Sequence, residues 1–90
     1  MQVTLEQANK IESFESRLKS LETNLRGSGD YSGLQAYKHK YWSYLEEIDV
    51  DSIIAERVAW IMVWADHKNI EVTQDYLNQQ LTEYEMEVRI

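Results

Sequence analysis

The sequence predicts an all-α protein, a small four-helix bundle. Hydrophobic residues recur with helical spacing in four segments, no proline occurs, and all three glycines lie within residues 27–33. The segment from Ile53 to Asp66, IIAERVAWIMVWAD, has only two polar residues before its closing aspartate, so a helix there is apolar around most of its circumference. We therefore expect a buried third helix, covered by its neighbours or by a partner.

The first helix is expected over residues 4–26. Thr4 and Gln7 have the spacing of a capping box, in which each side chain accepts a hydrogen bond from the other residue's backbone N–H. The apolar residues that follow are three and four apart for about two heptads, which is the spacing of a coiled coil. This spacing fits an intramolecular hairpin and a dimer interface equally well. The candidate oligomer seam consists of Ile11, Phe14, Leu18, Leu21 and Leu25.

A glycine-rich connection separates the first two helices. Gly27 is expected to end the first helix and residues 27–33 to form a flexible loop, because the glycine spacing matches no phosphate-binding motif. The second helix is expected over about 33–48. A second capping-box spacing, at Ser32 and Gln35, is predicted to begin it.

The third helix is expected over about 52–67. Asp49 and Asp51 precede it without the remaining ligand positions of a calcium loop, so helix capping is the better interpretation. No proline or glycine separates the second and third helices, which leaves a continuous or kinked connection possible. Asn69 is expected to end the third helix, because asparagine tolerates the left-handed conformation.

Thr73 is expected to cap a fourth helix over about 74–88. The third and fourth helices have the order of a helix-turn-helix, but the would-be reading helix lacks lysine and arginine and does not suit a DNA groove. Its outer face becomes acidic towards the end. The candidate acidic face consists of Glu83, Glu85 and Glu87.

Composition and charge limit the class of protein. Ninety residues, 43% of them hydrophobic, are expected to form a single domain over 1–90. The net charge of −7 repels phosphate groups, so we expect no direct nucleic-acid or membrane binding and a preference for basic protein partners. The longest apolar run is too short to span a bilayer, and the N-terminal residues lack a secretory pattern. We expect a cytoplasmic protein, in the host cytoplasm if the source is viral.

The sequence contains no pattern typical of catalysis. It has no cysteine, and its two histidines, His39 and His67, stand far apart without a metal-ligand pattern. No cofactor motif and no specific grouping of serine, histidine and aspartate occurs. We therefore expect a protein that is not an enzyme and that holds neither metal nor cofactor.

The aromatic content is the unusual feature. Three tryptophans and six tyrosines are more than one small core readily buries, and exposed aromatic residues are typical of binding surfaces. The plain alternative is that they form the core and nothing else. The candidate partner-binding residues are Tyr37, Tyr41, Trp42, Tyr44, Trp60 and Trp64.

Three functions follow as hypotheses. The first is an acidic protein-binding module, either an adaptor or a small inhibitor of the phage type that presents carboxylates to a basic surface. The second is a structural subunit of a homo-oligomer, with a dimer expected first. The third and weaker hypothesis is a small-ligand or nucleotide pocket lined by tyrosines together with Lys38, Lys40 or Arg26.

Overall fold

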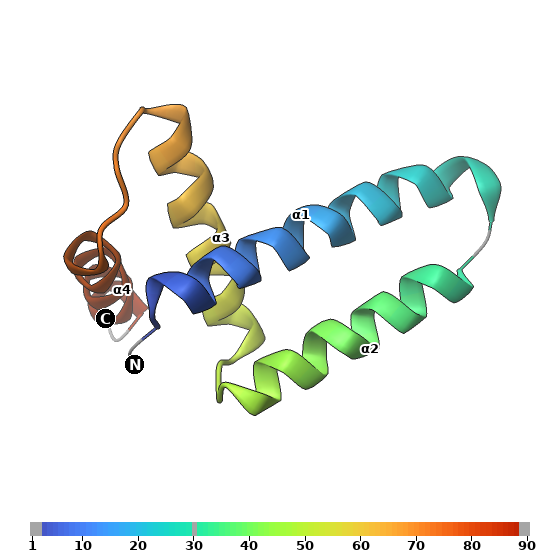
Figure 1. The fold of residues 1–90 in the computed structure, drawn as a ribbon, viewed down its shortest axis with the longest axis horizontal. Helices are drawn as coiled ribbons and strands as arrows, with labels where there is room; N and C mark the ends of the chain where they lie inside the picture. The colour runs from blue at the N-terminus through green and yellow to red at the C-terminus, as the bar shows by residue number, and fades with distance from the viewer. Residues whose placement is uncertain (1–2, 30, 89–90) are drawn as a thin grey trace.

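The computed structural model describes residues 3–29 and 31–88, and within them the chain forms four α-helices and no strand. The hairpin of α1 and α2 is antiparallel, α3 crosses α1 at a steep angle, and α4 lies beside the N-terminal end of α1 (Figure 1). The predicted all-α class with four helices is confirmed. The helices are α1 (Leu5–Ser28), α2 (Ser32–Glu47), α3 (Ser52–His67) and α4 (Gln74–Val88).

The predicted capping box at the start of α1 is confirmed. The Thr4 hydroxyl accepts a 3.1 Å hydrogen bond from the Gln7 N–H, and the Gln7 side chain accepts one of 3.1 Å from the Thr4 N–H. The end of α1 differs from the prediction, because the helix continues through Gly27. It is Gly29 that adopts the left-handed conformation, with φ of 71°, and bonds back to the Leu25 carbonyl at 3.3 Å. The loop is therefore shorter than residues 27–33.

The start of α2 also differs from the prediction. Ser32 is the first residue of the helix, and the capping position belongs to Tyr31, whose side chain makes no capping hydrogen bond. The expected capping box of Ser32 and Gln35 is wrong because the chain enters the helix one residue earlier than the pattern implies.

A sharp break separates α2 from α3. Asp49 adopts the left-handed conformation, with φ of 55°, and the next N–H, that of Val50, bonds back to the Leu45 carbonyl at 2.9 Å. This pattern closes the last turn of α2 and ends the helix. Asp51 then caps α3, because its carboxylate accepts a 2.7 Å hydrogen bond from the Ile53 N–H. The continuous connection is excluded, and the predicted capping role is confirmed for Asp51.

The end of α3 and the start of α4 follow the prediction. Asn69 has a φ of 57°, and the following N–H, from Ile70, bonds to the Ala65 carbonyl at 2.8 Å. The Thr73 hydroxyl accepts a 3.1 Å hydrogen bond from the Tyr76 N–H at the first turn of α4. Both predicted signals, a left-handed asparagine and a threonine cap, are confirmed.

The core lies where α1 crosses α3, with α2 and α4 closing two sides. Ile11 and Phe14 are buried in it, and Leu18 packs against it. The candidate oligomer seam is therefore wrong for Ile11 and Phe14, because their own protomer covers them; Leu21 and Leu25 are half-buried further along α1. The core consists of Val3, Ala8, Ile11, Phe14, Tyr41, Leu45, Val50, Ala55, Val58, Ile61, Leu77 and Leu81.

The third helix supplies the centre of this core but is covered on one side only. Its inner face carries three alanines, small side chains that let a neighbouring helix approach closely. Its outer face remains exposed within the protomer. The buried residues of α3 are Ala55, Val58, Ala59, Ile61 and Ala65. No helix in the described ranges is both long and apolar enough to cross a bilayer.

Candidate binding surface on α3

Four large apolar side chains are exposed on one face of α3. Ile53 is 62% exposed, and Trp60, Val63 and Trp64 are 47%, 48% and 49% exposed. Trp60 follows Ile53 by seven residues, and Val63 and Trp64 follow Trp60 by three and four, so all four lie on one side of the helix. We term these four residues the α3 outer face. The rings of Trp60 and Trp64 stack, with centroids 5.9 Å apart and an interplanar angle of 21°.

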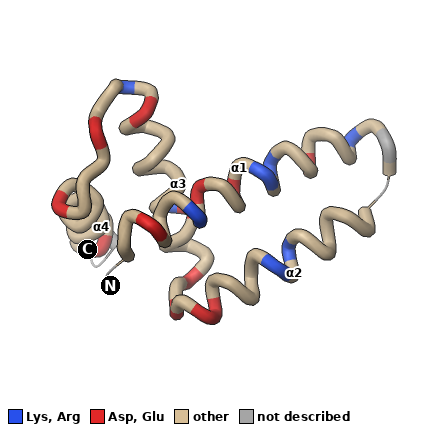
Figure 2. Tube along the Cα trace, viewed as in Figure 1, with Lys and Arg blue, Asp and Glu red and all other residues tan. Residues whose placement is uncertain are grey.

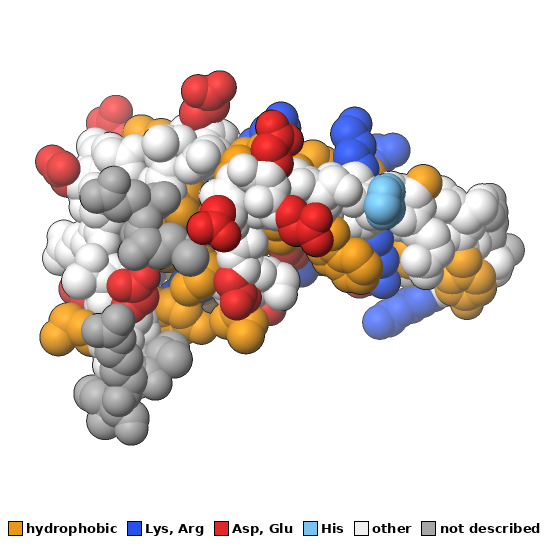
Figure 3. Space-filling model, turned by 90° about the horizontal axis from the view of Figure 1, so that it is seen from below, with side chains coloured by type: hydrophobic (Ala, Val, Ile, Leu, Met, Phe, Trp, Pro, Cys, Tyr) orange, Lys and Arg blue, Asp and Glu red, His pale blue; other side chains and the backbone are white. Residues whose placement is uncertain are grey.

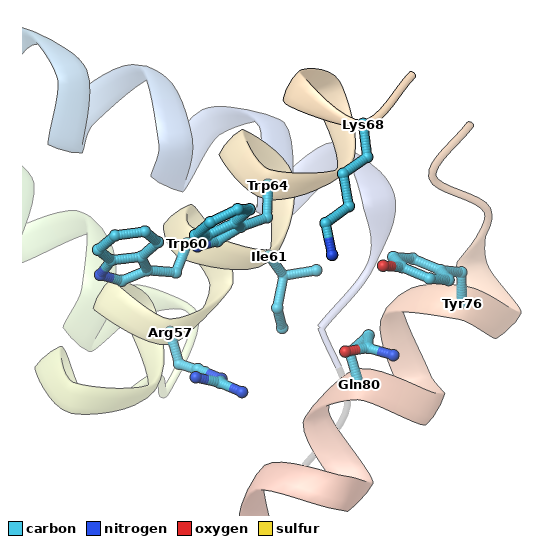
Figure 4. A pocket seen from close by; sticks show the side chains of 7 residues that line it. All are labelled: Arg57, Trp60, Ile61, Trp64, Lys68, Tyr76 and Gln80. Atoms are coloured by element: carbon cyan, nitrogen blue, oxygen red, sulfur yellow. The ribbon is translucent and has the colours of Figure 1, made fainter. Parts of the chain in front are cut away.

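A groove runs between the α3 outer face and α4. Figure 4 shows Ile61 at its centre, with the Trp64 ring on one side and the Tyr76 ring on the other. The Lys68 ammonium enters the space between these two rings and lies 5.4 Å from the centroid of the Trp64 ring. The groove has a volume of about 460 Å³. This cationic groove is lined by Arg57, Trp60, Ile61, Trp64, Lys68, Tyr76 and Gln80.

Arg57 has an unusual environment in the cationic groove. Its guanidinium carbon lies 4.9 Å from the centroid of the Tyr84 ring, a cation–π contact across to α4. Its Nε atom is buried and has no hydrogen-bond partner in the described part of the chain. Among residues 3–29 and 31–88, neither Arg57 nor Lys68 has a carboxylate within 4 Å. Within the described part of the chain, the groove therefore holds two cations that no carboxylate neutralises at close range.

A second groove runs on the other side of the α3 outer face, against α1. It is lined by three glutamates and one lysine, so its net charge is negative, opposite to that of the cationic groove. Its volume is about 260 Å³. Trp60 contributes to both grooves and stands between them. This acidic groove is lined by Glu12, Glu15, Ser16, Lys19, Glu56, Ala59, Trp60 and Val63.

Charges elsewhere are segregated along the molecule. Acidic residues gather at the C-terminal end of α2 and along the link into α4, whereas basic residues lie in the middle of the α1–α2 hairpin (Figure 2). The view from below shows the same division, with most red side chains over the half that carries α4 and blue ones over the hairpin (Figure 3). The two cations beside α4 are thus set in the more acidic half of the protein.

The three tyrosines predicted to bind a partner surround Phe14 instead. The ring centroids of Tyr37, Tyr41 and Tyr44 lie 5.6, 5.1 and 5.4 Å from that of Phe14. Tyr41 is only 2% exposed, so its assignment to a binding face is wrong: the hairpin turns this side of α2 towards α1. Tyr37 and Tyr44 are half-buried in the same cluster.

Burial changes the acidity of these phenols. It raises the pKa of the Tyr41 hydroxyl well above its ordinary value, and the hydrogen bond to Glu15 and the negative charge of that residue raise the pKa further. Burial also raises the pKa of Tyr37 and of Tyr44. All three phenols are held in the neutral form, in which they pack against Phe14.

The remaining candidate residues lie apart from one another. Trp42 is 54% exposed on α2 and lines neither groove, so the six aromatic candidates do not share one surface. On α4, Glu83 and Glu87 are exposed and Glu85 is half-buried, and none of the three lines either groove. The Glu83 carboxylate accepts a 3.5 Å hydrogen bond from the Gln79 amide.

The basic residues considered for a ligand pocket are also dispersed. The Lys38 ammonium lies 3.9 Å from a carboxylate oxygen of Glu22, so this lysine forms an ion pair that links α2 to α1. Lys40 lines a shallow groove of about 340 Å³ that also includes Tyr44 and Lys10. The Lys10 ammonium already lies over the Tyr44 ring, 4.6 Å from its centroid. Arg26 is exposed near the end of α1.

The cationic groove was missed by sequence reasoning. Arg57 lies on the same side of the helix as the two tryptophans, and that periodicity is the one signal of the groove visible in the sequence. Tyr76 and Gln80 come from α4, and nothing in their local pattern indicates that they face Trp64. Tertiary packing brings the two halves of the groove together.

The described residues contain no group of three or more histidine, aspartate or glutamate side chains placed to hold a metal ion. Comparisons of the chain with protein-family models, with curated proteins and with solved structures give no match. A function for this protein therefore has to be argued from the surface of α3.

Proposed function

We propose that this protein is a non-enzymatic binding module whose contact surface is the α3 outer face. The observation that carries the proposal is the stacked pair Trp60 and Trp64, each about half exposed beside two other exposed apolar residues. Tryptophan is the residue most enriched at energetic centres of protein interfaces, and contiguous exposed apolar patches mark interaction sites. A partner would remove these rings from water and gain the corresponding hydrophobic free energy.

The acidic groove favours a partner that places a basic side chain beside its apolar anchor. Glu12, Glu15 and Glu56 border the groove on one edge of the α3 outer face, and Lys19 offsets them in part. The net charge of −7 adds long-range attraction for a basic surface and so raises the rate of association. Such a module would serve as an adaptor or as an inhibitor that occupies a basic surface.

The test compares two exposed apolar positions. Val63→Lys places a charge in the α3 outer face, whereas Met86→Lys alters an exposed residue of α4 that lines neither groove. Wild-type protein and both variants are immobilised and incubated with an extract of the source cell. We expect the same protein to be retained by wild type and by Met86→Lys, to be lost with Val63→Lys, and to elute as salt is raised. Equal retention by all three proteins would contradict the proposal.

A second candidate function is self-association through the same face. The opposite charges of the two grooves favour it. If two copies met through their α3 outer faces about a two-fold axis parallel to α3, the acidic groove of one copy would face the cationic groove of the other. Light scattering over a range of protein concentrations tests it. A dimer that Val63→Lys dissociates supports this candidate, and a monomer at every concentration excludes it.

A further inference from the structure

We propose that the cationic groove between α3 and α4 binds a small planar anion, an aromatic ring that carries a carboxylate or a phosphate. This site does not rest on the protein-binding proposal, because its polar residues lie on the opposite edge of the α3 outer face from the acidic groove. Three features of the groove support it: its charge, its aromatic walls and an unsatisfied donor.

The charge of the groove is opposite to that of the protein. The chain has 16 acidic and 9 basic residues, yet among the described residues the groove is lined by two cations and no carboxylate. A lysine and an arginine within one small concave site are a recurrent arrangement for holding carboxylate or phosphate groups. An anion in the groove would supply a negative charge that the described residues lining it lack.

The walls of the groove suit a flat ring. Trp64 on α3 and Tyr76 on α4 stand on either side of the space above Ile61 (Figure 4), and an aromatic side chain that lines a groove favours stacking of a further ring. The Lys68 ammonium, the Tyr76 hydroxyl and the Gln80 amide all point towards that space. A volume of about 460 Å³ is within the range of small-molecule sites.

Arg57 supplies the third feature. Its guanidinium is held against the Tyr84 ring, and its Nε–H has no acceptor in the described part of the chain. A buried donor without a partner is unfavourable, so a group that brings acceptor oxygens to this guanidinium gains affinity. The side chain thus retains hydrogen-bonding capacity at the edge of a cavity.

The same charges favour a small anion over a nucleic acid. A polyanion meets the repulsion of the whole protein, whose net charge is −7, along its length. A ligand with one or two charges experiences mainly the local field of Arg57 and Lys68, because solvent and salt screen charges beyond about 8–10 Å. The groove is accordingly assigned to a single aromatic anion.

The indole N–H resonances of the three tryptophans provide the test. Protein labelled with ¹⁵N is titrated with adenosine monophosphate and, separately, with 2-naphthoate; adenosine and inorganic phosphate are the controls that lack the anion or the ring. We expect the Trp60 and Trp64 resonances to shift while that of Trp42, which lies outside the groove, stays in place. Binding of either anion more tightly than adenosine or phosphate supports the proposal, and the tighter of the two anions shows which combination of ring and anionic group the groove prefers.

Charge-removing variants complete the test. Lys68→Gln and Arg57→Gln are each expected to weaken binding about tenfold, the effect of losing one charge-assisted hydrogen bond of about 1.4 kcal/mol. Lys40→Gln, a matched change on α2, and Val63→Lys are expected to leave the affinity unchanged. Lys68 is exposed, so we expect the spectrum of unliganded Lys68→Gln to match that of the wild type, which would show that the variant is folded.

Four results would overturn the proposal: no shift with either aromatic anion, equal shifts at all three tryptophans, binding of adenosine or of phosphate as tight as that of the aromatic anions, or unchanged affinity in Lys68→Gln. Failure here leaves the protein-binding proposal standing, since Val63→Lys tests that proposal separately. Conversely, an intact anion site with no partner protein would remove only the earlier proposal.

Discussion

The hydroxyl of Tyr41 on α2 donates a 2.7 Å hydrogen bond to a carboxylate oxygen of Glu15 on α1. The Tyr41 ring is buried and stacks on Phe14 with a 5.1 Å centroid separation, so the apolar part of the side chain packs inside the hairpin. Its polar end reaches a half-buried acid that also lines the acidic groove. Through this hydrogen bond, the buried Tyr41 of the α1–α2 hairpin contacts a residue that lines the acidic groove, at one edge of the α3 outer face.

Removing this hydroxyl should destabilise the protein modestly. We expect Tyr41→Phe to lower the free energy of unfolding by about 1 kcal/mol, because the ring remains packed and the Glu15 carboxylate can still be solvated at the groove. Urea unfolding followed by circular dichroism measures the change. Tyr44→Phe is the control, since Tyr44 also packs on Phe14 but is half exposed. Equal losses in the two variants would show that the hydrogen bond contributes nothing specific.

The same hydroxyl should make the fold sensitive to alkali. The pKa of Tyr41 is raised in the folded protein above its ordinary value of 10.0, so the neutral form is favoured by folding. The resulting stability is complete below about pH 10 and is lost as the pH rises above it, with a limiting slope of about 1.4 kcal/mol per pH unit for one group.

Unfolding free energies measured from pH 8 to pH 11 would check this alkaline decline. In Tyr41→Phe we expect a shallower decline, to which Tyr37 and Tyr44 still contribute because their pKa values are raised in the same direction. A decline as steep as that of the wild type would mean that other groups are responsible.

The left-handed residue between α2 and α3 offers a route to a more stable protein. Asp49 has a φ of 55° and places a negative charge at the C-terminal end of α2, and both features are unfavourable for an aspartate. Asp49→Gly should raise the free energy of unfolding by about 0.5–1 kcal/mol. Asp49→Ala removes the same charge but keeps a Cβ atom, so thermal unfolding should separate the two variants, with the glycine variant melting higher.

Gln74 joins the start of α4 to the N-terminal segment before α1. Its amide oxygen accepts a 3.0 Å hydrogen bond from the Leu5 N–H, and its amide nitrogen donates one of 2.7 Å to the Val3 carbonyl. Gln74→Ala should cost about 2 kcal/mol, because two part-buried backbone groups lose their partner. Gln79→Ala, an exposed change on the same helix, should be close to neutral. Hydrogen exchange at the Leu5 amide gives a local readout and should accelerate in Gln74→Ala alone.

The two faces of α3 should respond to substitution in opposite ways. Val58 is fully buried, so Val58→Ala should lower the free energy of unfolding by about 2 kcal/mol. Val63→Lys, on the exposed face, should change stability by less than about 0.5 kcal/mol in the isolated protein. Chemical denaturation of both variants checks the contrast. A large loss with Val63→Lys in dilute solution would indicate that the face is already covered, as in a dimer.

The sequence alone determined the helices and several of their ends. Helical periodicity located all four segments, and the caps at Thr4, Asp51 and Thr73 followed from side chains that bond to backbone groups a few residues away. Such signals are local and can be recognised without the fold. Two glycines, Gly27 and Gly29, could each end α1, and the pattern predicted the wrong one. A glycine can lie within the last turn of a helix as well as just after it, so the sequence does not distinguish these positions.

Only the tertiary structure decided which aromatic residues are exposed and which charges meet. Tyr41 and Trp60 are equally plausible surface residues in the sequence, yet one is buried against Phe14 and the other is left exposed. That outcome depends on how α1 crosses α3 and pairs with α2. The cationic groove likewise needs α4 to return beside α3, so that Tyr76 faces Trp64. Contacts between distant segments depend on packing, which a local sequence pattern does not encode.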